Sequence, residues 1–195
     1  MAKTKFRWED PSVIRIGKED GHALMLPYDS EEAALSEEES IYKQSLNGMW
    51  KFYWQRGLKN QPENFESDEF DDSAWDEIKV PSVWQTEGYS IPYYYASTFP
   101  KALSRSKSKI PSIDHNMQEI GFYRKTFVLS DSFKDREVFL HFGAAKSALE
   151  VYVNGSFVGY SQGSMVPHEL GRRFAEASRP HYSDGKSAKG TTRQA

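Results

Sequence analysis

The stretch Leu149-Glu-Val-Tyr-Val-Asn-Gly-Ser-Phe-Val-Gly-Tyr160 carries the clearest local signal in the chain. Apolar residues alternate on both sides of its Asn-Gly pair, which supplies the two positive φ angles of a type I′ turn. The stretch therefore predicts a tight β-hairpin. Because a two-residue loop fixes the register, we expect Val151 to face Val158 and Tyr152 to pair with Phe157 on the other face.

Period-two alternation recurs along the middle of the chain and indicates further strands. A half-buried strand places every second side chain in the core, so alternating apolar runs bounded by Gly or Pro are typical of strands. Such runs occur at 50–54, at 78–80 before Pro81, at 123–129 and at 138–142. Because helical periodicity is almost absent, the pattern predicts an all-β sandwich with long loops.

Three segments of different character divide the chain. Residues 1–45 are polar and are expected to form an irregular arm, in which Ser30 caps a short helix with an acidic first turn. Residues 46–170 carry the strand patterns and form the predicted sandwich, which we expect to be incomplete. Residues 171–195 are basic and lack Val, Ile, Leu, Met and Trp. They are expected to be disordered, because they cannot bury enough apolar surface to offset their ordering entropy.

The composition excludes several functional classes. The 195 residues carry a formal net charge of −3 and no cysteine. No overall basic character points to nucleic acid, and disulfides, thiolate metal sites and a cysteine nucleophile are ruled out. No apolar run approaches the length of a signal sequence or a membrane helix. We therefore expect a cytoplasmic protein that binds neither nucleic acid nor membrane.

No catalytic motif is apparent from residue spacing alone. The histidines are not at metal-ligand spacing, and His141, inside a predicted strand, is expected to be a structural side chain. The acidic run at 68–72 is expected to be a solvated turn. The best candidate site is aromatic, formed by Trp84–Tyr89 and Tyr93–Tyr95, because the C–H faces of sugars stack on aromatic rings. The alternative is that these rings seal the edge of the core beneath a long loop at 90–111.

A series of motifs resembles the N-terminal sugar-binding domain of glycoside hydrolase family 2, and in particular that of the large bacterial β-galactosidases. The motifs begin at Trp8-Glu-Asp-Pro11 and continue as Ser45–Phe52, Phe70–Tyr89, Gly121–Phe127, Gly143–Ala148, Val153–Gly155 and Val158–Ser164. Their order and spacing match over about residues 6–170. The resemblance implies a jelly-roll β-sandwich of the galactose-binding-domain type.

The resemblance also implies that catalysis takes place elsewhere. In this family a separate barrel domain holds two catalytic glutamates, which hydrolyse terminal β-D-galactosides by a retaining mechanism. The family's catalytic signatures, one of them around an Asn-Glu pair, do not occur in these 195 residues. The chain alone is therefore expected to be inactive, with no catalytic residue. Its expected partners are a galactoside, the remaining domains of the enzyme and a second copy in a homo-oligomer.

The resemblance assigns sugar-binding roles to a few positions. Ala96 stands where the family has an Asn that reaches the galactose, and Tyr94 and Tyr95 belong to the same stretch. Asp184 matches a family Asp near the galactose and is the only position implied as a metal ligand. Trp84 completes the candidate set. The family uses Mg²⁺ and Na⁺, and no cofactor is expected in this chain itself.

Two questions stay open at this point. The change in composition near residue 171 fits a frameshifted or truncated gene, a partial sequence with a divergent end, or a free-standing module with a natural basic tail. The function is that of a β-galactosidase domain or, alternatively, of a free-standing carbohydrate-binding or subunit-interaction module. A sandwich without its last strands exposes an edge and an apolar face, so self-association is expected.

Overall fold

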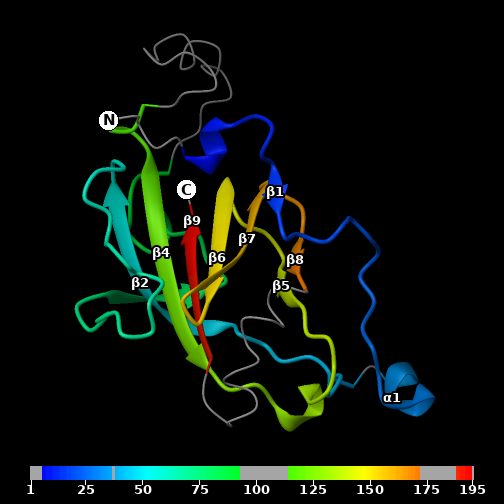
Figure 1. The fold of residues 1–195 in the computed structure, drawn as a ribbon. Helices are drawn as coiled ribbons and strands as arrows, with labels where there is room; N and C mark the ends of the chain where they lie inside the picture. The colour runs from blue at the N-terminus through cyan, green and yellow to red at the C-terminus, as the bar shows by residue number, and fades with distance from the viewer. Residues whose placement is uncertain (1–5, 37, 93–113, 172–187, 195) are drawn as a thin grey trace.

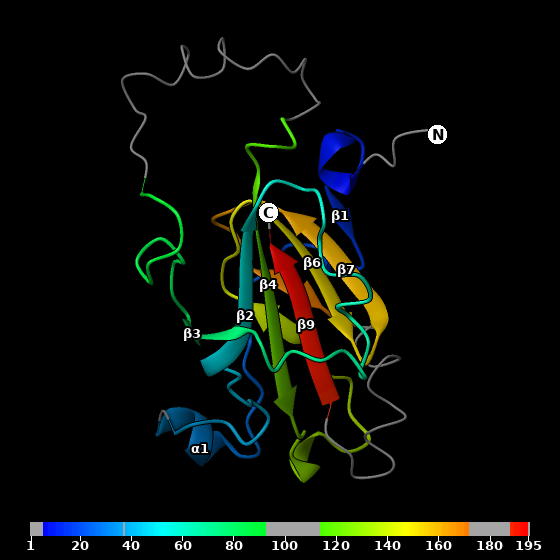
Figure 2. The ribbon, with the colours of Figure 1, turned by 90° about the vertical axis from the view of Figure 1, so that its left-hand side faces the viewer.

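A seven-stranded antiparallel sheet forms the centre of the protein (Figures 1 and 2). The computed structural model describes residues 6–36, 38–92, 114–171 and 188–194. The sheet has the order β1-β7-β6-β9-β4-β2-β3. Its strands are β1 (Arg15–Ile16), β2 (Gly48–Arg56), β3 (Asp76–Val80), β4 (Glu119–Phe127), β6 (Ala148–Val153), β7 (Ser156–Gln162) and β9 (Ala188–Gln194). The predicted all-β class is confirmed.

A second, smaller sheet packs on one face of the first. It consists of β5 (Leu140–Phe142) and β8 (His168–Leu170), which pair antiparallel. Leu170 lies so close to Gly159 of β7 that a Cβ at Gly159 would stand 2.6 Å from the leucine side chain. A larger residue at Gly159 would therefore force β7 and β8 apart, and the close approach gives the two-layer packing of a sandwich.

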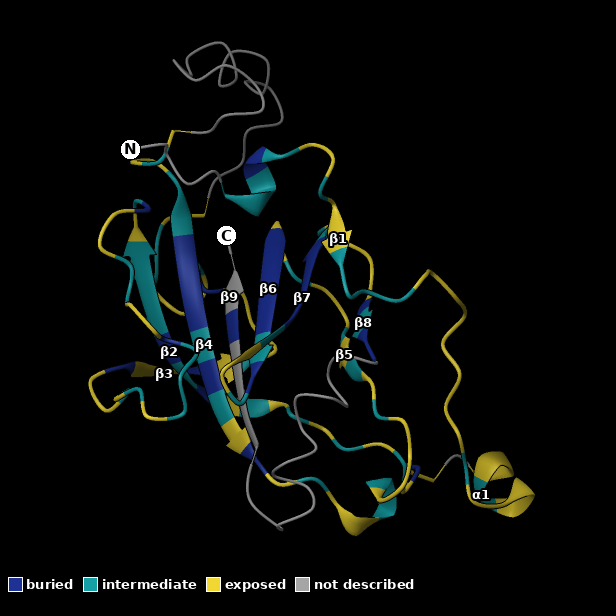
Figure 3. Ribbon diagram, viewed as in Figure 1, coloured by how far each residue is buried: buried dark blue, intermediate teal, exposed yellow. Residues whose placement is uncertain are grey.

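Three apolar clusters fill the two faces of the large sheet, and Figure 3 shows β4, β6 and β7 as its most buried strands. The β6/β7 cluster contains Phe127, Leu149, Val151, Val153, Val158 and Leu170. The β2/β3 cluster contains Trp50, Phe52, Ile78 and Trp84, with Tyr123 packed against it. The third cluster, on the opposite face, contains Leu58, Phe65, Trp75, Ile120 and Phe122. Adjacent residues of one strand fall into different clusters because successive side chains point to opposite faces.

The hairpin of β6 and β7 confirms the predicted turn and corrects the predicted register. Asn154 and Gly155 have positive φ angles of 49° and 75°, and the rings of Tyr152 and Phe157 are 5.4 Å apart. The expected pairing of Val151 with Val158 is wrong, because a bulge shifts the register and Val151 pairs with Gly159. The additional residue on β7 brings Gly159 opposite Val151, on the face where Leu170 approaches.

The strand β9 occupies the centre of the sheet, within the segment 171–195 for which the sequence predicts disorder. It pairs antiparallel with β4 on one side and with β6 on the other. Its backbone groups are thus bonded along both edges, which a polar sequence allows as well as an apolar one. Over Ala188–Gln194 the structure therefore has a strand between β6 and β4, where the sequence predicts disorder.

The N-terminal arm contains regular secondary structure, although the sequence predicts an irregular segment. It contains a 3₁₀ turn, η1 (Arg7–Glu9), the short strand β1 and the helix α1 (Glu31–Leu35). Ser30 accepts a hydrogen bond from the Ala33 amide at 3.1 Å, which confirms the predicted cap. Figure 1 shows α1 at the far end of the arm, away from the sheet. A second 3₁₀ turn, η2 (Asp131–Phe133), follows β4.

Candidate functional site

A tight turn after β3 builds the described part of the predicted aromatic site. The carbonyl of Trp84 accepts hydrogen bonds from the amides of Glu87 and Tyr89, at 3.1 Å and 3.0 Å. The φ angle of +95° at Gly88 permits the chain to close this turn, since side-chain-bearing residues rarely adopt such angles. The turn fixes Tyr89 and the following residues relative to Trp84.

Trp84 lies inside the core rather than on the surface. Its side chain packs on Gly121 and Phe52, and only 8% of the residue is exposed. Its indole Nε1 has no hydrogen-bond partner among the described residues. Of the two roles open for this residue, stacking on a sugar or sealing the edge of the core, the burial fits the second.

Tyr89 forms the polar edge of the same cluster. Its ring meets Phe52 edge-on, with 4.8 Å between centroids, and its hydroxyl donates to Asp76 Oδ2 at 2.8 Å. Burial raises the pKa of the Tyr89 phenol, and the neighbouring Asp76 carboxylate, which accepts its proton in a hydrogen bond, adds to the shift. The phenol therefore stays a hydrogen-bond donor at neutral pH.

Both ends of the segment that carries the other predicted sugar-binding residues are anchored. At its start, the hydroxyl of Ser90 donates to Glu119 Oε1 at 2.5 Å. At its end, the His115 carbonyl accepts from the Leu58 amide at 2.8 Å, and His115 Nε2 lies 2.8 Å from Glu9 Oε1. Glu9 is 5% exposed, so η1 of the N-terminal arm also supports this end of the segment.

Most of the predicted site residues lie beyond the described ranges. Tyr93, Tyr94, Tyr95, Ala96 and Asp184 fall in 93–113 and 172–187, which the structure does not describe. Their sugar-binding and metal-binding roles stay predictions. Within the described residues, no group of three or more His, Asp or Glu side chains is arranged to hold a metal ion.

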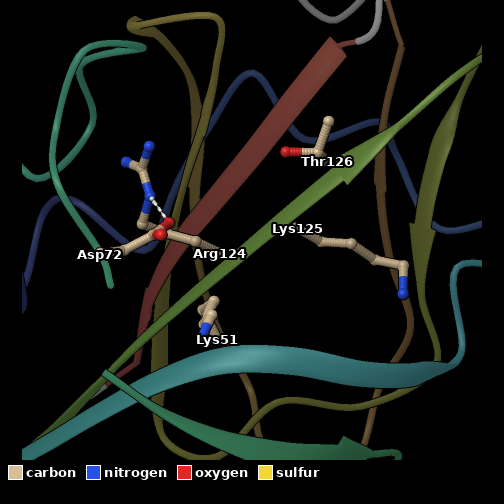
Figure 4. A pocket seen from close by; sticks show the side chains of 5 residues that line it. All are labelled: Lys51, Asp72, Arg124, Lys125 and Thr126. Carbon is tan, nitrogen blue, oxygen red and sulfur yellow. Dashed lines mark hydrogen bonds and ion pairs between the residues drawn. The ribbon is translucent and has the colours of Figure 1, made fainter. Parts of the chain in front are cut away.

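A hollow beside β2 and β4 has a volume of about 210 Å³ (Figure 4). Its walls are formed by Lys51, Asp72, Arg124, Lys125 and Thr126. Each of its cations already has a partner: Arg124 Nε is 2.9 Å from Asp72 Oδ2, Lys125 Nζ donates to the Met49 carbonyl at 3.1 Å, and Lys51 Nζ is 3.8 Å from Glu77. The hollow is therefore a structural ion-pair site rather than a free anion site.

Arg124 is a structural residue that the sequence did not reveal. It is 3% exposed and donates to the carbonyl of Phe65, to the carbonyl of Ser67 at 3.0 Å and to Asp72. It thereby fixes the 65–72 loop to the sheet. The acidic run at 68–72, expected to be a solvated turn, thus contains one carboxylate with a structural role. Strand alternation offered one signal of this burial, because Arg124 lies on the same strand face as the buried Phe122.

Two histidines of the second sheet are held by hydrogen bonds. His141 Nδ1 lies 2.8 Å from Glu169 Oε1, which confirms its predicted structural role, and His22 of the arm binds the other oxygen of Glu169 at 2.8 Å. His168 is fully buried, with Ser161 Oγ at 2.8 Å and Lys18 Nζ at 3.1 Å from its Nδ1. Burial lowers the pKa of His168, and the Lys18 charge lowers it further.

Solved structures support the fold. A β-glucuronidase from Ruminococcus gnavus superposes with a TM-score of 0.51 at 18% identity, covering 77% of this chain and 21% of that one. A β-glucuronidase from Bacteroides uniformis superposes with a TM-score of 0.50 at 24% identity, over 77% of this chain and 14% of that one. No helix in the described ranges has the length and apolar character needed to cross a membrane.

Sequence relatives match most of the chain. A β-galactosidase of Priestia megaterium is 36% identical over 163 residues, which are 83% of this chain and 16% of the relative. A β-galactosidase of Psychromonas ingrahamii is 35% identical over 84% of this chain and 15% of its own length. A β-galactosidase large subunit of Lactobacillus helveticus is 30% identical, over 86% of this chain and 28% of its own length. The chain therefore spans a small part of the relatives that it matches.

The family assignment rests on a match that covers the whole sheet except β1 and β9. The profile of the sugar-binding domain of the glycosyl hydrolases of family 2 matches residues 43–177. This range contains the turn around Trp84, the anchored segment ends and the Asn154-Gly155 hairpin. The chain belongs to glycosyl hydrolase family 2, through the sugar-binding domain of that family.

Proposed function

We propose that this chain acts as the N-terminal sugar-binding domain of a β-galactosidase that hydrolyses terminal β-D-galactosides. The observation that carries the proposal is the match of residues 43–177 to the family's sugar-binding domain, together with relatives named β-galactosidase at 30–36% identity. The catalytic glutamates belong to a domain outside this chain. The 195 residues alone therefore bind substrate weakly and do not hydrolyse it.

The role of the domain is to present the segment at 93–113 to the sugar. Both anchored ends support this, because Ser90 is tied to Glu119 and His115 to Glu9. Tyr94, Tyr95 and Ala96 lie between these anchors in the sequence. Trp84 and Tyr89 act as the rigid support of the segment.

Mg²⁺ and Na⁺ enter the proposal only because the resemblance to the family implies them. Asp184 is the one residue of this chain proposed as a ligand, and it lies beyond the described ranges. The described residues form no cluster suited to a metal ion. No step of the proposed function is therefore assigned to either ion.

The decisive variant is Tyr94→Ala in the β-galactosidase that carries this domain, with Tyr94→Phe as the matched control that keeps the ring. If the ring contacts bound sugar, KM for a nitrophenyl β-D-galactoside rises by about tenfold in Tyr94→Ala and changes little in Tyr94→Phe. Unchanged KM and kcat in Tyr94→Ala would contradict the proposed contact. Hydrolysis by the purified 195-residue chain would contradict the assignment of catalysis to another domain.

A free-standing carbohydrate-binding module is the second candidate. Two observations favour it. The family match covers a sugar-binding domain, and the chain contains no Asn-Glu catalytic signature. Titration calorimetry of the purified chain with lactose separates the two candidates. Saturable binding that is lost in Tyr94→Ala supports the module, and the absence of measurable heat supports a domain that binds sugar only within the larger enzyme.

A further inference from the structure

Three polar interactions attach the N-terminal arm to β8. The amide of Glu19 donates to the carbonyl of Glu169 at 2.9 Å. Before it in the chain, Lys18 Nζ lies 3.1 Å from His168 Nδ1. After it, His22 Nε2 lies 2.8 Å from Glu169 Oε2. We call these three interactions the arm contact. Two of them depend on the protonation state of a histidine ring.

The surroundings of His22 require its ring to be charged. Its Nδ1 lies 2.9 Å from the carbonyl oxygen of Ala23, and its Nε2 lies 2.8 Å from Glu169 Oε2. A carbonyl and a carboxylate only accept hydrogen bonds, so both ring nitrogens must donate. A neutral imidazole has one N–H and leaves one of the two oxygens facing a lone pair. Loss of the proton therefore removes one hydrogen bond and the attraction between the ring and the carboxylate.

The groups that influence the His22 ring come from β8, from β5 and from the arm itself. The hydrogen bond to the Ala23 carbonyl and the Glu169 carboxylate raise the pKa of His22, and the charge of Glu19 adds to the rise. His141 of β5 shares the carboxylate, since its Nδ1 lies 2.8 Å from Glu169 Oε1. His141 needs only one N–H for this bond, so the bond persists when that ring is neutral.

The surroundings of His168 require the opposite state. Its Nδ1 lies 3.1 Å from Lys18 Nζ and 2.8 Å from the hydroxyl of Ser161. An ammonium group only donates, so Nδ1 must offer a lone pair, and the ring is neutral. Burial lowers the pKa of His168, and the charges of Lys18 and His141 lower it further. A proton on Nδ1 would bring two cations together and break this part of the arm contact.

We propose that the arm contact is a pH-sensitive device that holds the arm on β8 while His22 is protonated and His168 is neutral. The contribution of His22 is present at low pH and is lost as the pH rises through its folded-state pKa, which lies above the ordinary value of 6.5. The contribution of His168 is lost as the pH falls through its folded-state pKa, which lies below 6.5. The arm is therefore held most tightly around pH 6.5. On either side of this range, the exposed apolar run 24–26 that follows His22 becomes free to move relative to the sheets.

The test follows the distance between the arm and the sheets in the full 195-residue chain. A pair of dyes is attached at Leu24→Cys in the arm and at Met165→Cys in the turn after β7, where the parent side chains are 65% and 89% exposed. The chain itself has no cysteine, so only these two positions react. Energy transfer is measured from about pH 5 to about pH 9. The released fraction is expected to rise at least about threefold from its minimum toward both ends of this range. Energy transfer that does not change with pH would overturn the proposal.

Variants of the labelled chain assign each half of the response to one histidine. His22→Gln keeps a donor for Glu169 but does not titrate, so it should lose the change on the alkaline side and keep the change on the acidic side. Lys18→Met removes the cation beside His168 without altering the buried ring, and it should lose only the acidic change.

The matched control is His141→Gln, which alters the other ring on Glu169 and should keep both changes. An alkaline change that persists in His22→Gln, or that disappears in His141→Gln, would overturn the proposal. Tryptophan fluorescence of the unlabelled chain follows the sheets over the same pH range. A change in this fluorescence that coincides with the change in energy transfer would show unfolding of the domain instead, and this too would overturn the proposal.

Discussion

Replacing Gly121 by alanine tests the packing that supports the candidate site. A Cβ at this position would lie 2.6 Å and 2.9 Å from two carbon atoms of the Trp84 ring and 2.9 Å from the Phe52 ring. Both rings are buried, at 8% and 0% exposure, so neither can move aside into solvent. Overpacking of a rigid core costs about 1–3 kcal/mol, and the gain from restricting the unfolded chain offsets less than about 1 kcal/mol. We therefore expect Gly121→Ala to lose about 2 kcal/mol of unfolding free energy.

Gly143→Ala is the matched control for this substitution. A Cβ at Gly143 meets no atom within 4 Å, and Gly143 is not among the residues with positive φ. Its unfolding free energy should therefore stay within about 0.5 kcal/mol of the parent chain. Urea unfolding followed by tryptophan fluorescence measures both variants, and unchanged m values exclude altered unfolded states. Equal stability of Gly121→Ala and Gly143→Ala would refute the packing argument.

Two further predictions concern buried polar residues. Arg124→Met should lower the free energy of unfolding, measured in urea, by about 2–3 kcal/mol, because it leaves two loop carbonyls and Asp72 without their donor. Asp72→Asn should lower it by less than about 1 kcal/mol, since that carboxylate is partly exposed. Equal losses would contradict the role of the carbonyl bonds. The folded-state pKa of His168 lies below the ordinary histidine value of 6.5 because of burial and the charge of Lys18. As the pH falls, the unfolded chain therefore binds this proton at a higher pH than the folded chain does. The contribution of His168 to the free energy of unfolding is fully present above pH 6.5 and is lost as the pH falls through the folded-state pKa. His168→Gln should flatten the decline in stability between about pH 7 and pH 5, and an unchanged slope would contradict the assignment.

Local sequence signals predicted the parts of the fold that depend on neighbouring residues. The Asn154-Gly155 pair predicted the turn because few other residues adopt its positive φ angles. Ser30 predicted the start of α1 for a similar local reason. The bulge in β7 was not predictable, since it depends on Leu170 approaching Gly159 from the other sheet. Alternation alone shows which residues are apolar, but it does not reveal where one strand carries an additional residue.

Contacts distant in sequence account for what the residue patterns missed. β9 has no apolar alternation, and it becomes a strand because β4 and β6 offer backbone partners on both sides. Arg124 resembles a surface cation in sequence, yet the 65–72 loop folds over it and supplies acceptors. At the site, the sequence identified Trp84 and Tyr89 as one cluster, and the structure confirms that they belong together. It could not show that Trp84 is buried, because the turn that buries it depends on Gly121 of a distant strand.

Immunocapture followed by a hydrolysis assay tests the proposed function most directly. An antibody against residues 43–170 would capture the native polypeptide that carries this domain from its source cells, and the captured material would be assayed with a nitrophenyl β-D-galactoside. We predict hydrolysis by the captured polypeptide, with a mass several times that of the 22.4 kDa chain, and none by the purified 195-residue chain. Captured material of about 22 kDa that does not hydrolyse the galactoside would contradict the account.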